Sequence, residues 1–182
     1  MKYQKTLLVA SFIIFSSFIV NEYVATNETN YYSDVRDGNR YKIVKLNNLF
    51  WFQENLRYRT NSKKDTLISE NNCGVFYLYE DIKKACPNGW RLPTEKEVKD
   101  LIKAEKKGKI NILDTLNVQL CGRIDYEKHS KIGIQNTFWL NEDLIDNHVK
   151  HWHAFSTENK THSHNVINAR RKFPIRCVCE KK

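Results

Sequence analysis

The stretch 78–94, LYEDIKKACPNGWRLPT, constrains the fold of this chain more than any other part of it. Apolar residues spaced four and three apart between Leu78 and Ala85 predict a short amphipathic helix. Proline disfavours a helical conformation for the residue before it and cannot continue the helical ladder. We therefore expect the helix to end at Cys86 and Pro87, so that a cysteine marks its end.

The second half of the stretch predicts a turn and a second helix. Asn88-Gly89 has turn chemistry, and the large apolar side chain of Trp90 follows it. Thr94 and Glu97 have the spacing of a capping box, so we expect a helix over about residues 95–107. The residues expected to face the core, and the glycine expected to end the helix, are Val98, Leu101, Ile102 and Gly108.

Length and composition favour one folded domain with a short appendage. The chain has 182 residues, of which 41% are hydrophobic and 12% aromatic, and this content excludes global disorder. The formal net charge is +9. Such a charge suits acidic glycans, an anionic cell surface or nucleic acid as partners, and general solubility without a charged partner is the alternative.

The N-terminus has the pattern of an export signal. A short lysine-containing segment precedes an uncharged apolar core over residues 7–20, which is short for a membrane-spanning helix. We therefore expect a signal peptide at residues 1–25, with an uncleaved membrane anchor as the alternative. Its removal takes away two lysines and one glutamate and leaves a net charge of +8. A flexible polar lead-in is expected at 26–33 and the domain at 34–182.

The first part of the domain predicts short strands joined by turns. Asp37-Gly38 is a hairpin signal, and Asn47-Asn48 marks a second turn before the apolar run 49–52. The polar segment 60–72 is expected to be an exposed loop. Residues 74–77 are expected to lead directly into the first helix.

The later part of the domain is less regular. We expect a long irregular loop region over residues 109–150, with a short strand-like piece at 137–140. Loops of this length are uncommon in compact domains unless they carry function. Two strands are expected at 148–156 and 162–168, and a closing strand at 173–178.

The cysteines indicate disulfide bonds. An exported chain meets an oxidising compartment, where disulfides form and persist. Cys177 and Cys179 lie two apart in an expected strand and point the same way, which makes a bond between them geometrically poor. The odd number of five leaves at least one thiol outside any intramolecular disulfide. The remaining three are Cys73, Cys86 and Cys121.

Four blocks in this order resemble the Fibrobacter succinogenes major paralogous domain, a family of exported bacterial modules. They are RDGNRYKIVKLNNLFWFQENLRY, GVFYLYEDIKKACPNGWRLPT, TFWLNED and FPIRCVCE, and together they extend over roughly residues 34–180. Two features depart from the family: residues 140–143 stand where small residues are usual, and the loop before Trp139 is not glycine-rich. The ligand of this loop is therefore expected to differ from that of the family, or to be absent.

The resemblance implies an α+β fold of the C-type lectin-like kind, similar also to the formylglycine-generating enzymes. Two helices would pack on small antiparallel sheets, with a long irregular loop region beside them. Similarity to lectin-like folds further implies a disulfide from Cys86 to the last strand, at Cys177. The resemblance implies no particular activity.

The histidines form a candidate metal site. On extended strands His151 and His153 share one face, as do His162 and His164. A hairpin that brings the four imidazoles together would suit zinc or copper. The alternative is a set of polar residues on the surface of an antiparallel sheet. We expect no cofactor, with zinc or calcium as the alternative.

Ligand contact is expected in the long loop region and its adjoining strand. Asn141, Glu142 and Asp143 loosely resemble the calcium and sugar motif of calcium-dependent lectins, although three such side chains fall short of the six to eight ligands that calcium takes. Tyr126 or Trp152 could provide an aromatic platform for a sugar. A solvated turn is the alternative for residues 141–143.

These observations favour a secreted or cell-surface binding module without catalytic activity. An acidic glycan or a cell-surface protein is the expected partner, since export disfavours nucleic acid despite the charge. Membrane contact is expected only through the N-terminal segment, and only if that segment stays uncleaved. The alternatives are a structural or adhesive surface component and, less favoured, a metal-dependent enzyme of the formylglycine-generating type.

Overall fold

A computed structural model of the chain describes residues 30–165 and 170–180, so the expected signal peptide lies outside the described residues. The strands of the first half are β1 (Asn30–Ser33), β2 (Arg40–Leu46), β3 (Leu49–Phe52), β4 (Thr66–Ile68) and β5 (Gly74–Leu78). Those of the second half are β6 (Arg123–Asp125), β7 (Lys128–Ser130), β8 (Gln135–Trp139), β9 (His148–Phe155), β10 (Asn159–Asn165), β11 (Lys172–Phe173) and β12 (Val178–Cys179). The helices are α1 (Glu95–Lys106) and α2 (Ile112–Thr115), with 3₁₀ helices η1 (Glu70–Asn72) and η2 (Tyr79–Lys84).

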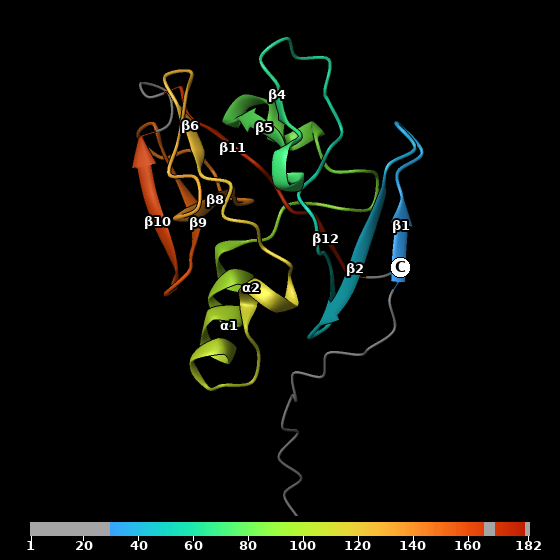
Figure 1. The fold of residues 1–182 in the computed structure, drawn as a ribbon, viewed down its shortest axis with the longest axis vertical. Coiled ribbons are helices and arrows are strands. Elements are labelled where there is room, and N and C mark those ends of the chain that lie inside the picture. The colour runs from blue at the N-terminus through green and yellow to red at the C-terminus, as the bar shows by residue number, and fades with distance from the viewer. Residues whose placement is uncertain (1–29, 166–169, 181–182) are drawn as a thin grey trace, which may run out of the picture.

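The strands form three small antiparallel sheets, which confirms the α+β class. The strand orders are β1-β2-β3-β12, β10-β9-β8 and β4-β5-β11-β6-β7. Figure 1 shows α1 and α2 together at one end of the described chain, with the β1–β2 hairpin on one side and the β9–β10 hairpin on the other. The sheets therefore do not form one continuous layer, and the two helices lie at one end of them (Figure 1).

The expected turns in the first sheet are confirmed, and the sheet begins earlier than expected. The β2–β3 turn consists of Asn47 and Asn48, because Leu46 pairs with Leu49 across it. The β1–β2 connection contains Gly38, whose positive φ of 75° favours glycine. The strand Asn30–Ser33 lies in the segment expected to be a flexible lead-in, where it pairs with β2.

The helix expected at 78–85 is a 3₁₀ helix, whereas α1 forms as predicted. η2 begins directly after β5 and ends at Lys84, close to Cys86-Pro87, and 3₁₀ helices are frequent in such short connecting pieces. Ile82 and Ala85 are nevertheless buried. The capping box of α1 is complete, since Thr94 Oγ1 accepts from the Glu97 backbone N–H and a Glu97 carboxylate oxygen accepts from the Thr94 N–H.

The region 109–150 is not a long irregular loop. It holds α2, β6, β7 and β8, and segment 60–72 likewise holds β4 and η1. These elements are only three to five residues long, so their sequences show no periodic pattern. Gly122 illustrates the local constraint, because its φ is 75° and a Cβ there would lie 2.0 Å from the carbonyl oxygen of Ser130.

The closing strand expected at 173–178 is two short strands in different sheets. β11 pairs with β5 and β6, and β12 pairs with β3. Pro174 lacks a backbone N–H, so the ladder of β11 does not continue through it. The chain crosses from one sheet to another over residues 174–177, all of which are buried.

Both disulfides involve strand ends or helix ends. Cys86 at the end of η2 is bonded to Cys177, with 5.9 Å between the Cα atoms, as the family resemblance implies. Cys73 is bonded to Cys121, a pairing that the sequence left open, with 5.6 Å between the Cα atoms. The thiol of Cys179 is buried and belongs to neither disulfide.

Arg176 lies in the crossing segment and is 1% exposed. Its guanidinium donates to the Asn55 side chain at 3.0 Å and to backbone carbonyls, and its centre lies 5.4 Å from the centre of the Phe138 ring. The carbonyls belong to Phe52, Leu116 and Asn117. Burial lowers the pKa of Arg176 to about 9, so the side chain stays charged at neutral pH.

Removal of the Cys86–Cys177 bond by Cys86→Ser and Cys177→Ser should lower the free energy of unfolding by about 2–5 kcal/mol. The bond closes a sequence separation of 91 residues, against 48 for Cys73–Cys121. In the chain-entropy description the longer loop is worth about 0.6 kcal/mol more. Urea unfolding of both paired-serine variants tests this. A larger loss from the Cys73 and Cys121 variant would show that native packing, not loop length, decides the difference.

Arg176→Met should lower the free energy of unfolding by at least about 3 kcal/mol, because each buried carbonyl left without its donor costs about 1–3 kcal/mol. Arg59→Met at an exposed position is the matched control and should change stability by less than about 0.5 kcal/mol. Chemical denaturation of the two variants measures the difference. Equal stability of both would contradict a structural role for Arg176.

Glu97 makes α1 sensitive to acid. Burial raises the pKa of Glu97, but hydrogen bonds from Arg91 and Thr94 outweigh burial and leave this pKa below its usual value. The folded state therefore gains stability above the unfolded pKa of about 4.3 and loses it as pH falls through the lower folded pKa. Glu97→Gln should cost about 0.5–2 kcal/mol at pH 7, with a difference that shrinks near pH 3. Urea midpoints at both pH values test this, and an undiminished difference at low pH would contradict it.

Candidate functional site

The residues predicted to bind a ligand do not form one site. Tyr126 is 66% exposed in the two-residue turn between β6 and β7. Asn141, Glu142 and Asp143 follow β8, and Glu142 and Asp143 line a hollow whose walls include neither Tyr126 nor Trp152. The loop prediction therefore identifies residues at separate places, of which only Tyr126, Asn141 and Asp143 are exposed, and no shared pocket.

Segment 141–143 docks onto the start of α1. The Glu142 carboxylate accepts from the backbone N–H of Glu95 at 2.7 Å, and its carbonyl oxygen accepts from the Tyr79 hydroxyl at 2.9 Å. The backbone N–H of Asn141 donates to the Pro93 carbonyl at 2.8 Å. A carboxylate at the N-terminus of a helix stabilises the helix dipole. Glu142 thus has a structural task that accounts for its position.

Trp152 is a core residue and cannot serve as a surface platform. Its side chain is 0% exposed and its ring stacks on Phe138 with 4.6 Å between the ring centres. The indole N–H donates to the Asn159 side chain at 3.1 Å, and Asn159 in turn donates to Glu105. On β9, Trp152 faces the helices while its two histidine neighbours occupy the opposite face.

The hairpin brings histidines together, as the strand pattern predicts. His151 and His153 are buried neighbours on β9, and His162 on β10 lies opposite His151 in the register. The side chain of His164 lies outside the part that the structure describes. Within residues 30–165 and 170–180, no three histidine, cysteine, aspartate or glutamate side chains are already arranged to hold a metal ion.

A different feature, which we call the lysine groove, lies between α1 and the β2–β3 turn. It has a volume of about 450 Å³. Its apolar wall contains Leu46, Leu49, Trp51 and Leu101, while Asn47 and Asn48 of the turn form one rim. α1 provides the other rim, where Lys96, Asp100, Lys103 and Lys107 follow each other at helical spacing.

Positive charge dominates the helical rim of the lysine groove. Lys96 pairs with Asp100 at 3.0 Å, and Glu97 is held by Arg91 at 2.7 Å, so the two acidic side chains of the groove are neutralised within the protein. Lys103, Lys107 and Lys109 are exposed around the same groove. The groove therefore carries an excess of positive charge available to an anion.

Trp51 adds a hydrogen-bond donor to this wall. The residue is 1% exposed on β3, and its indole N–H has no acceptor among the described residues. A buried polar group without a partner costs about 1–3 kcal/mol. Such groups in native proteins need an explanation. An oxygen atom of a ligand in the groove would provide the missing acceptor once the side chains that cover this N–H move aside.

The residues of the lysine groove can be seen in the sequence, but the sequence does not show that they lie close together. Residues 49–52 predict only a strand, and the lysines of α1 predict only a solvated helix face. Their meeting depends on how the first sheet packs against α1. The one signal of the groove in the sequence is the helical spacing of several lysines beside the apolar residues expected to face the core.

In comparisons with known proteins, the chain matches no family model, no curated protein and no solved structure. The resemblance to the Fibrobacter succinogenes major paralogous domain therefore stays a prediction. In the described part of the chain, no helix combines the length and the apolar character needed to cross a bilayer.

Proposed function

We propose that the chain is an exported, non-catalytic binding module that holds an acidic polymer, best represented by an anionic glycan, in the lysine groove. The buried indole N–H of Trp51 beneath a lysine rim is the observation that carries this proposal. The groove offers three kinds of contact to one ligand: ammonium groups for its charges, an indole N–H for an oxygen atom and apolar surface for sugar rings.

Export rests on the N-terminal pattern and on the two disulfides. Cys73–Cys121 and Cys86–Cys177 both have geometry within the usual range for such bonds. Disulfides persist in secreted, periplasmic and cell-surface proteins and are rare where thiols are kept reduced. The mature protein is proposed to begin near Thr26. An acidic cell-surface glycan would be accessible from that compartment, whereas nucleic acid would not.

A C-type lectin-like relationship is also proposed, on the family resemblance and two supporting features. The bond from Cys86 to Cys177 joins the residues that the resemblance implies. A capped helix follows the Asn88-Gly89 turn, in the order expected for the family block. This relationship concerns the scaffold, and it does not specify the ligand.

Affinity for an oligogalacturonate probe tests the groove. Lys103→Gln with Lys107→Gln should weaken binding roughly 2- to 30-fold, because two solvent-exposed charge contacts contribute about 0.5–2 kcal/mol. The matched control is Lys83→Gln with Lys84→Gln, which removes the same charge from exposed positions of η2 and should leave affinity unchanged. Trp51→Phe should cost a further 0.5–1.5 kcal/mol, about one hydrogen bond.

The second measurement is how binding depends on the salt concentration and on the charge of the probe. Isothermal titration should show weaker binding as the salt concentration rises, and little binding of the neutral methyl-ester form of the same oligosaccharide. Equal losses in both lysine pairs would assign binding to overall charge, and equal binding of both probe forms would remove the acidic ligand. Either result would overturn the proposal.

A further inference from the structure

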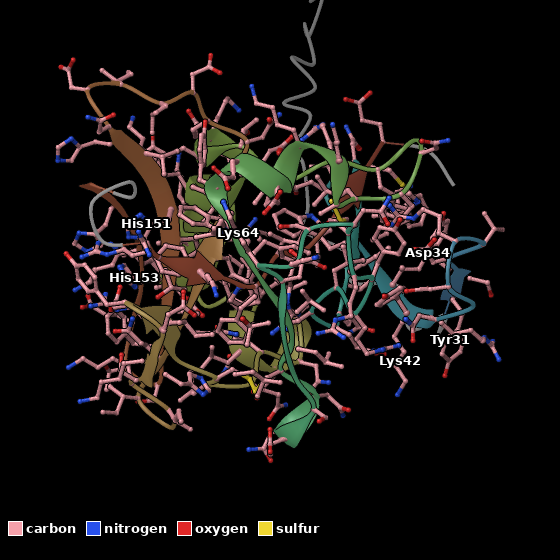
Figure 2. All side chains as sticks on the ribbon, turned by 90° about the horizontal axis from the view of Figure 1, so that it is seen from above. Tyr31, Asp34, Lys42, Lys64, His151 and His153 are labelled. Carbon is pink, nitrogen blue, oxygen red and sulfur yellow. A yellow bond between two sulfur atoms is a disulfide. The ribbon has the colours of Figure 1, made fainter. Side chains whose placement is uncertain are left out.

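The strongest cluster that the proposed function leaves unused is on the sheet β10-β9-β8. His151 and His153 lie on the same face of β9 and are 0% and 4% exposed. Figure 2 shows the two side chains next to each other on this sheet, on the opposite side of the molecule from Tyr31 and Lys42 of the β1–β2 hairpin. Their Nε2 atoms face each other at 2.9 Å.

The second nitrogen of each ring is held by a neighbour. His151 Nδ1 lies 3.3 Å from the Val149 carbonyl oxygen, and His153 Nδ1 lies 3.0 Å from the Thr137 hydroxyl. The Gln135 amide donates to the Thr137 hydroxyl at 2.8 Å, and the same amide nitrogen lies 3.2 Å from His153 Nδ1, to which it donates only in the tautomer that leaves Nδ1 without a hydrogen. When both Nδ1–H groups donate to these oxygens, both Nε2 lone pairs point into the space between the rings. Oxygen acceptors on the far nitrogen are the usual outer contacts of metal-binding histidines.

The nitrogen separation fits one metal ion. Imidazole nitrogens bind transition metals at about 2.0–2.1 Å, so two nitrogens at a right angle stand about 2.9 Å apart and at a tetrahedral angle about 3.3 Å apart. The observed 2.9 Å corresponds to the right angle of a tetragonal centre. Tetragonal nitrogen geometry is typical of Cu²⁺, which also binds more tightly than the other divalent first-row ions.

His162 lies where a third imidazole is needed. Rings that share one metal ion have centres about 4.5–5.2 Å apart, since each centre is about 3.2 Å from the metal. The ring centre of His153 lies 4.6 Å from that of His151 and 5.1 Å from that of His162. His162 is exposed, so its ring is able to turn without disturbing the core and a metal ion has a route from solvent.

We propose that His151 and His153 form a Cu²⁺ site through their Nε2 atoms, with His162 turning to supply the third nitrogen. Solvent completes the tetragonal set. The site is separate from the lysine groove, because its face of β9 is opposite to the one that carries Trp152 and packs towards the helices. Zn²⁺ occupies the same site more weakly.

The test is titration of Cu²⁺ into tag-free protein, followed by calorimetry and electron paramagnetic resonance. One ion per chain should bind, with nitrogen couplings from three imidazoles. His151→Gln with His153→Gln should weaken binding roughly 100-fold, and His162→Gln roughly tenfold. The matched control is His148→Gln, an exposed histidine of β9 that should leave affinity unchanged.

The alternative is a neutral hydrogen bond from His153 Nε2–H to His151 Nε2, with His153 Nδ1 accepting from Thr137. It predicts no specific Cu²⁺ uptake and no nitrogen couplings, and that result would overturn the site. An unchanged affinity in His162→Gln would overturn the three-histidine set, and this variant stays informative if the buried double variant fails to fold. Because the probe is the metal alone, failure here leaves the glycan result unaffected.

Discussion

The packing of the first sheet against the helices depends on the hydrogen bonds that the guanidinium of Arg176 donates. This guanidinium satisfies carbonyl groups on two segments more than 50 residues apart, Phe52 at the end of β3 and residues 116–117 after α2. No carboxylate among the described residues pairs with it at salt-bridge distance, so its charge is balanced by carbonyl dipoles, an amide and the face of Phe138. A planar donor with five N–H groups suits this task, since lysine reaches fewer acceptors from one position.

The local parts of this fold could be predicted wherever a short sequence determines its own conformation. The capping box of Thr94 and Glu97 satisfies backbone groups within one turn, and α1 forms where the sequence places it. The Asn47-Asn48 turn and the strands β2, β3 and β9 were likewise predictable from turn chemistry and apolar pattern. By contrast, β11 and β12 exist only because strands far away in the sequence provide their hydrogen bonds.

The candidate sites follow the same division. Sequence spacing predicted that His151 and His153 share a face, because this depends only on the two-residue period of a strand. It did not predict that Trp152 stacks on Phe138, nor that Trp51 lies beneath the lysines of α1, because both depend on packing between distant segments. The charge of Glu142 indicated a ligand, but that carboxylate serves the first turn of α1.

The crossing segment between β11 and β12 also sets an order of events for a newly made chain. Within eight residues, 172–179, it contains a strand of each of two sheets, the buried Arg176 and the sulfur partner of Cys86. All the elements that it joins are synthesised earlier. The two sheets and the disulfide of Cys86 therefore stay incomplete until this segment has been synthesised. A chain threaded through an export channel from its N-terminus would therefore remain unclosed, and so still able to pass, until residues 172–179 cross.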